Sequence, residues 1–86
     1  MLKISLPAEA DGSIFDRNDI PKPLNGTDIE VNGDVILLFD DEEQAVSYLD
    51  TLEDFATATD NDAGKNAINL IVSAISNDEF VQAYLQ

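Results

Sequence analysis

The stretch that decides the fold is DIEVNGDVILLF, residues 28–39, in which two β-rich segments flank an Asn-Gly dipeptide. Asn-Gly is the preferred centre of a two-residue hairpin turn, because both turn residues take positive φ there. The first segment, residues 28–31, alternates polar and apolar side chains, which predicts a strand with one face in water. The second segment, residues 34–39, is apolar almost throughout. This run predicts a central strand with helices on one side of the sheet.

The segment that follows, FDDEEQAVSYLDTLEDFAT at residues 39–57, predicts an amphipathic helix. Its apolar residues recur at three- and four-residue steps and form one stripe: Ala45, Tyr48, Leu49, Leu52, Phe55 and Ala56. The residues expected on the opposite face are Glu43, Ser47, Asp50, Asp54 and Thr57. Asp40 as N-cap and Glu43 three residues later match a capping box, and the helix dipole favours acids in the first turn.

The remaining segments complete a small α+β domain. Residues 2–6 alternate as a half-buried strand, and residues 7–27 predict a long loop. Ile14, Phe15 and Ile20 are expected to attach this loop to the core, and a short extra strand near residues 13–15 would fit the pattern. Residues 63–75 predict a buried helix, and a capping box at 76–79 opens a last helix. The apolar residues of that helix are expected to face inward: Phe80, Val81, Tyr84 and Leu85.

We therefore predict one domain over residues 1–86, with a small antiparallel sheet packed against about three C-terminal helices. The sheet would consist of the first strand and the Asn-Gly hairpin. The longest apolar run has five residues, whereas a bilayer span needs about 20. The N-terminal apolar stretch is too short for a signal peptide. We expect a soluble, cytoplasmic protein.

The residue types of the chain argue against catalysis and metal binding. It has no Cys and no His, which excludes a cysteine nucleophile and removes the commonest general base and transition-metal ligand. Asp60-Asn61-Asp62 begins like a calcium loop, but Lys65 stands at the sixth position instead of Gly. Ile71 stands at the twelfth position instead of a bidentate Glu. We expect no enzyme activity, no cofactor and no metal site.

Charge is the outstanding property of the sequence. Eighteen acidic and four basic residues give a net charge of −14, and residues 23–64 hold twelve acids and no base. Such a surface repels nucleic acid and anionic membranes and attracts basic proteins. The candidate partner-binding residues are acids expected on exposed positions: Asp28, Glu30, Glu42, Glu43, Asp50, Glu53, Asp54, Asp60 and Asp62.

In size, charge and α+β character, the chain resembles a class of small acidic inhibitors, many of them phage-encoded. This class includes anti-CRISPR proteins, anti-restriction proteins and inhibitors of DNA glycosylases. The resemblance implies a non-enzymatic inhibitor in the host cytoplasm that mimics nucleic acid on the basic surface of a nuclease or CRISPR effector. It extends to no individual residue, and it leaves the oligomeric state open.

Other functions fit the same sequence. An immunity protein or antitoxin for a basic nuclease toxin would present the same surface. An accessory domain would use the acidity for solubility, as in adaptation to high salt. Against salt adaptation, the acids are unevenly placed, because residues 65–77 hold none.

Overall fold

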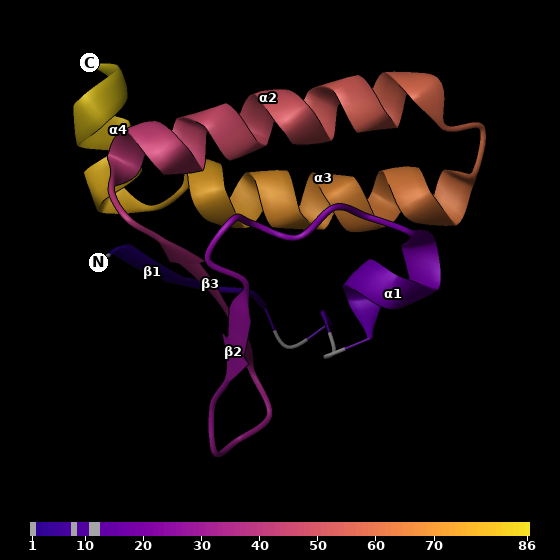
Figure 1. Cartoon of the computed structure of the whole chain (residues 1–86), viewed down its shortest axis with the longest axis horizontal. Coiled ribbons are helices and arrows are strands. Elements are labelled where there is room, and N and C mark those ends of the chain that lie inside the picture. Colours follow the sequence, from indigo (N-terminus) through magenta and orange to yellow (C-terminus); the bar gives the residue numbers. More distant parts are fainter. Residues whose placement is uncertain (1, 8, 11–12) are drawn as a thin grey trace.

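A three-stranded antiparallel sheet and a layer of helices make up the fold (Figure 1). The computed structural model describes residues 2–7, 9–10 and 13–86. The strands are β1 (Leu2–Ser5), β2 (Thr27–Ile29) and β3 (Val35–Phe39), in the order β1-β3-β2. The helices are α1 (Ile14–Asn18), α2 (Glu42–Ala58), α3 (Asp62–Ser76) and α4 (Glu79–Leu85). The predicted α+β class is confirmed.

β3 is the central strand, as its apolar sequence predicts. Leu2 of β1 pairs with Phe39, and Ile29 of β2 pairs with Val35 at the other end. Side chains on a strand alternate between its two faces, so Val35, Leu37 and Phe39 all point inward and are buried. Against them pack the buried residues of α2 and α3, among them Leu52, Ile68, Ile71 and Ile75.

The hairpin between β2 and β3 corrects the predicted two-residue turn. The backbone N–H of Glu30 donates to the carbonyl of Asp34 over 2.9 Å, so three residues, 31–33, form the loop. Gly33 alone of these takes a positive φ, 93°. This is the common three-residue arrangement, a turn closed by one left-handed residue, and it places Val31 at the tip.

Two helix caps lie one or two residues from their predicted positions. The N-cap of α2 is Asp41 instead of Asp40, and its carboxylate accepts the backbone N–H of Gln44 over 2.9 Å. Gln44 completes the exchange, because its side-chain oxygen accepts the backbone N–H of Asp40 over 2.7 Å. Asp78 caps α4, accepting from Phe80 and Val81. In both helices a carboxylate satisfies N–H groups that have no partner within the helix.

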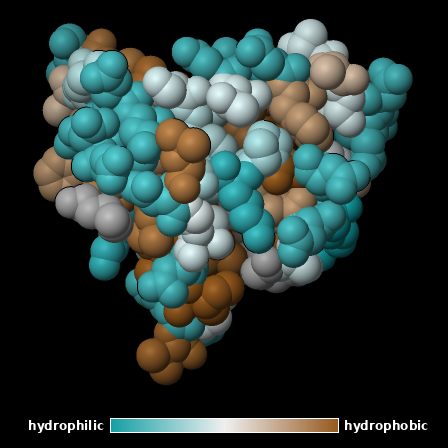
Figure 2. Space-filling model, in the orientation of Figure 1, coloured by the Kyte–Doolittle hydropathy of each residue, from teal (hydrophilic) through white to brown (hydrophobic). Residues whose placement is uncertain are grey.

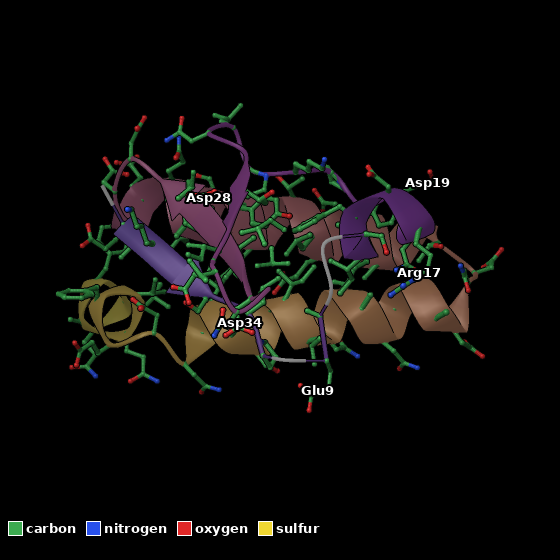
Figure 3. All side chains as sticks on the ribbon, turned by 90° about the horizontal axis from the view of Figure 1, so that it is seen from below. Glu9, Arg17, Asp19, Asp28 and Asp34 are labelled. Atoms are coloured by element: carbon green, nitrogen blue, oxygen red, sulfur yellow. The ribbon has the colours of Figure 1, made fainter. Side chains whose placement is uncertain are left out.

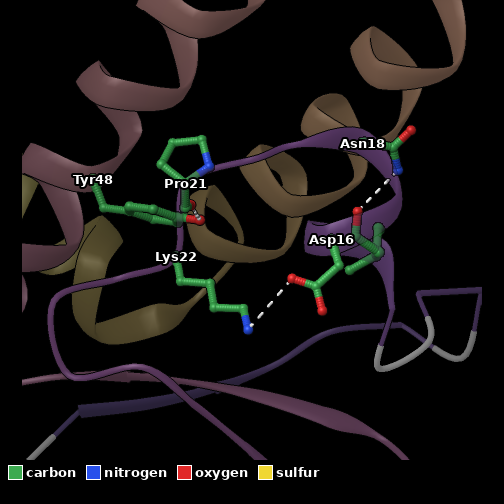
Figure 4. Close-up of polar contacts among 6 residues, drawn as sticks. Asp16, Asn18, Pro21, Lys22 and Tyr48 are labelled. Carbon is green, nitrogen blue, oxygen red and sulfur yellow. Dashed lines mark hydrogen bonds and ion pairs between the residues drawn. The ribbon is translucent and has the colours of Figure 1, made fainter.

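The predicted extra strand near residues 13–15 is wrong, because α1 begins at Ile14. Within the predicted loop, residues 8, 11 and 12 lie outside the described residues. Ile14, Phe15 and Ile20 are buried, so this segment is attached to the core as expected. Asn18 donates to the carbonyl of Ile14 over 2.9 Å, and the Nζ atom of Lys22 lies 3.7 Å from an Asp16 carboxylate oxygen (Figure 4).

The predicted inward packing of α4 is wrong for three of its four apolar residues. Val81 is fully buried, whereas Phe80, Tyr84 and Leu85 are 55, 50 and 58 % exposed. α4 covers the end of α2 and α3 and makes its main contacts with these two helices. A helix at the end of the layer buries one narrow side, and the aromatic residues remain in solvent.

Candidate functional site

The acidic face of α2, which we define as Glu43, Asp50, Glu53 and Asp54, lies on the side of the helix away from the core. All four side chains are exposed, whereas Ala45, Tyr48 and Leu52 are buried on the inner side. At 100° per residue, Glu43, Asp50 and Asp54 fall close to one line along the helix. Asp50 and Asp54 are separated by about 6 Å of helical rise. The helix therefore presents an ordered row of carboxylates to solvent.

Several acids outside the acidic face of α2 serve local structure. Asp41 and Asp78 cap helices, and Asp40 accepts a hydrogen bond of 2.8 Å from the side chain of Asn25. Asp28 accepts from the backbone of the next residue, and Asp34 accepts from Asn32. The charge at these positions has a structural use within the fold.

A second group of acids makes no such contact. Within residues 2–7, 9–10 and 13–86, no hydrogen bond or ion pair engages these side chains: Glu30, Glu42, Glu43, Asp50, Glu53, Asp54, Asp60 and Asp62. Glu42, Glu43 and Asp62 lie in the first turns of α2 and α3, where the helix dipole favours negative charge. For Asp50, Glu53 and Asp54 of α2, neither a bonding partner among the described residues nor a helix N-terminus offsets the mutual repulsion. Asp60 directly precedes Asn61, the N-cap of α3, where the helix dipole favours negative charge.

The predicted site residues divide into two places. Glu42 and the acidic face lie on α2, and Asp60 and Asp62 lie at the corner between α2 and α3. Asp28 and Glu30 lie on the β2–β3 hairpin, which Figure 1 shows projecting on the side of the molecule away from α2. Figure 3, seen from below, places Asp28 and Asp34 on this hairpin, far from the α2–α3 corner. The nine residues therefore do not form one contiguous surface.

Two exposed apolar features adjoin the acids. The sequence favoured a core position for Phe80 over a place in a partner-binding patch, and it did not single out the hairpin tip. Phe80 of α4 lines a shallow depression of about 220 Å³ together with Leu2, Asp40, Asp41 and Glu42. An exposed aromatic ring beside three carboxylates can receive the stem and the charge of an arginine or lysine side chain. The sequence gives no signal for this exposure, because the spacing of the apolar residues in 80–85 is that of an ordinary amphipathic helix.

The second apolar feature is the hairpin tip. Val31 is fully exposed, and Ile29, which lines the same shallow depression, is 54 % exposed. Figure 2 shows this tip as a hydrophobic protrusion at the lowest point of the molecule. An exposed valine at the end of a hairpin contributes nothing to the core, so its contacts are available to another molecule.

The described residues do not bring chemistry-bearing groups together. Among them, no three carboxylates converge closely enough to hold a metal ion, and none of their helices is long and apolar enough to cross a membrane. Burial raises the pKa of Tyr48 above its ordinary value, because the charged form would lose its hydration. Tyr48 lies on the inner side of α2, away from the acids that carry the charge.

In comparisons with known proteins, no family model, no curated protein and no solved structure matched this chain.

Proposed function

We propose that this protein is a non-enzymatic inhibitor that binds the basic nucleic-acid-binding surface of a target protein through the acidic face of α2 and the adjoining α2–α3 corner. The observation that carries the proposal is the set of exposed carboxylates at Asp50, Glu53 and Asp54, which have no hydrogen-bond or ion-pair partner in the described part of the chain. Like charges held close together reduce the stability of a fold. We therefore infer that these carboxylates are kept for binding to another molecule.

The spacing of these carboxylates suits a surface built for phosphates. Neighbouring turns of α2 separate Asp50 from Asp54 by about 6 Å, close to the step between successive phosphates of a nucleic-acid strand. Lysine and arginine side chains that neutralise phosphates accept carboxylates with the same charge-assisted hydrogen bonds. The row of acids would thus occupy a groove from which nucleic acid is then excluded.

Apolar contacts would add affinity at the ends of this surface. Protein interfaces depend on a few aromatic or large apolar residues surrounded by polar groups. Phe80 lies beside the acids at the start of α2, and it is half exposed. Electrostatic attraction would then govern the rate of association, and Phe80 would slow dissociation.

The experiment compares two charge reversals of equal size. Asp50→Lys with Asp54→Lys alters the acidic face of α2, and Glu9→Lys with Glu79→Lys makes the same net change elsewhere. The wild-type protein and both variants are used to capture proteins from a host lysate at low and moderate salt, with and without competing DNA. We expect the wild-type protein to capture a nucleic-acid-handling protein and DNA to displace it. The variant with Glu9→Lys and Glu79→Lys should capture the same protein, whereas the variant with Asp50→Lys and Asp54→Lys should not.

An equal loss of capture in both variants would show that net charge alone matters and would contradict the proposal. Undiminished capture by both variants would contradict it as well. Captured proteins whose binding is changed by neither DNA nor salt would also contradict the proposal. They would favour an accessory domain whose acidity serves solubility. An immunity protein or antitoxin would give the same capture result, with a nuclease toxin encoded next to it as the captured target. The gene neighbourhood therefore separates these two functions.

A further inference from the structure

The outer edge of β1 carries backbone groups without partners. Leu6 donates its backbone N–H to the carbonyl of Val35 over 2.8 Å, in the same register as the pairing of β1 with β3. In an antiparallel strand the backbone groups of successive residues point to alternate sides. Leu2, Ile4 and Leu6 therefore bond to β3, and the N–H and C=O groups of Lys3 and Ser5 point away from the sheet. In the described part of the chain, nothing pairs with them.

A groove of about 690 Å³ runs along this edge, with β1 as one wall and α3 as the other. In Figures 1 and 3, the C-terminal end of β1 reaches the C-terminal end of α3. On the helix side it is lined by the exposed residues Asn66, Asn69 and Ser73 of α3 and Asn77, the C-cap of α3, with the half-buried Leu70 and Ala74 between them. Amide and hydroxyl groups thus line the groove over about three helical turns, and the unpaired edge of β1 lies along part of it.

The occupant that satisfies such an edge is an extended polypeptide. Donors and acceptors at strand spacing are matched by another strand, and alternate side chains then enter the groove. A second copy of this chain fits less well. Each copy carries a charge of −14, and α3 already stands beside the edge where a symmetry-related α3 would have to lie. The groove is lined by one base, Lys3, and one acid, Asp78, so its charge is balanced and suits an uncharged strand.

We propose that the groove between β1 and α3 binds an extended segment of the basic partner protein, which joins the sheet as a fourth strand through the backbone of Lys3 and Ser5. The basic character of the partner rests on the function proposed above. The strand addition itself rests on the unpaired edge and the groove.

The probe is a displayed library of random peptides of about ten residues, long enough for one strand and its flanks. It is selected against the whole protein in about 1 M salt, where the Debye length falls to about 3 Å and the acidic surface attracts little. Selected peptides are then synthesised and titrated against the wild type and three variants.

Ser5→Pro removes the outward N–H of β1 and leaves the bonds to β3, because proline is tolerated on an edge strand. Ser73→Trp fills the groove from α3. The matched control is Thr27→Pro, which removes an outward N–H from β2, the opposite edge of the sheet. Thermal unfolding followed by circular dichroism establishes that each variant is folded.

We expect Ser5→Pro and Ser73→Trp each to weaken peptide binding at least about tenfold, which corresponds to about 1.4 kcal/mol. Thr27→Pro should leave the affinity within about twofold, and the amide of Ser5 should become protected from hydrogen exchange when peptide binds. If Ser5→Pro does not fold, Ser73→Trp and the exchange of Ser5 still decide the matter. The absence of selected peptides, equal binding to all variants, or a dimer formed through β1 would overturn the proposal.

The two proposals fail separately. Asp50→Lys with Asp54→Lys should leave peptide binding in high salt unchanged, because these residues lie outside the groove. Loss of DNA-sensitive capture with intact peptide binding would reject the inhibitor function and retain the strand site.

Discussion

The phenolic hydroxyl of Tyr48 on α2 donates a hydrogen bond of 2.7 Å to the backbone carbonyl of Pro21. Twenty-seven positions separate the two residues, and the bond joins the helix layer to the irregular segment before β2. The Tyr48 ring also packs against Phe39, with ring centroids 5.7 Å apart. One side chain therefore connects α2, β3 and the segment that follows α1.

Tyr48→Phe tests this connection, because it removes the hydroxyl and keeps the ring. The Pro21 carbonyl would lose its partner, so we expect a loss of about 1–2 kcal/mol in the free energy of unfolding. Urea unfolding followed by circular dichroism measures it. Tyr84→Phe is the control, since Tyr84 is half exposed, and its value should stay within about 0.5 kcal/mol of the wild type. Equal effects of the two changes would mean that the bond to Pro21 adds no stability.

Alkaline pH should reduce stability through the same residue. Burial raises the pKa of Tyr48, so in the folded protein it keeps its proton where the unfolded chain loses it, near pH 10. The stabilisation is complete below about pH 10 and is lost as pH rises, with a slope of up to about 1.4 kcal/mol per pH unit. Unfolding free energies from about pH 9 to 11.5 should fall more steeply for the wild type than for Tyr48→Phe. Parallel curves would contradict this assignment.

The cap of α2 gives a third prediction. Asp41→Ala should cost about 1 kcal/mol of stability, because the backbone N–H of Gln44 loses its acceptor. Asp41→Asn should cost little, since asparagine caps about as well as aspartate. Glu43→Ala should change the unfolding free energy by less than about 0.5 kcal/mol. The reverse ranking of Asp41→Ala and Glu43→Ala would support the capping box predicted from sequence.

Repulsion along the acidic face of α2 predicts a gain in stability when charge is removed. Asp50→Asn with Asp54→Asn should raise the unfolding free energy by about 0.2–0.5 kcal/mol at low salt, and added salt should erase the gain. Asp16→Asn should give no gain, because Lys22 lies 3.7 Å from Asp16. Thermal unfolding at low and high salt compares the three proteins, and a gain independent of salt would exclude repulsion as its cause.

The hairpin loop supplies the last prediction. Gly33 has a φ of 93°, so Gly33→Ala should cost about 1–2 kcal/mol. Val31→Ser at the fully exposed tip should leave stability within about 0.5 kcal/mol. Chemical unfolding of both variants tests the loop, and a tolerated Gly33→Ala would argue for another turn conformation.

Sequence patterns could predict the elements that repeat regularly. The apolar steps in residues 39–57 predicted α2 and its exposed acids, and the apolar run of β3 predicted the central strand. The loop length of the hairpin could not be derived in this way, because Asn-Gly fits both a two- and a three-residue loop. The register is decided by the inward placement of Val35, which depends on the packing of the whole sheet.

The cap and the candidate site show a second limit. Asp40 and Asp41 are equally good caps in sequence, and the choice depends on Gln44 and on Asn25, which lies 15 positions before Asp40. The exposure of the acids could be predicted from the helical pattern. Whether Asp50 and Asp54 have partners could not, because it depends on where distant segments lie in the fold. The exposure of Phe80 likewise depends on how few elements surround α4.

The pairing of Leu2 with Phe39 also has a kinetic consequence. The β2–β3 hairpin and the α2–α3 pair join neighbours in the chain, whereas β1 reaches β3 only by closing the segment of 29 residues between them, 6–34. Local structure forms in about microseconds, and closing longer loops costs more entropy. We therefore expect β1 to dock last and to leave first, and each departure would uncover the edge of β3. At that moment a charge of −14 keeps two opened molecules apart, so the acidity that weakens the native state also protects the chain from aggregation.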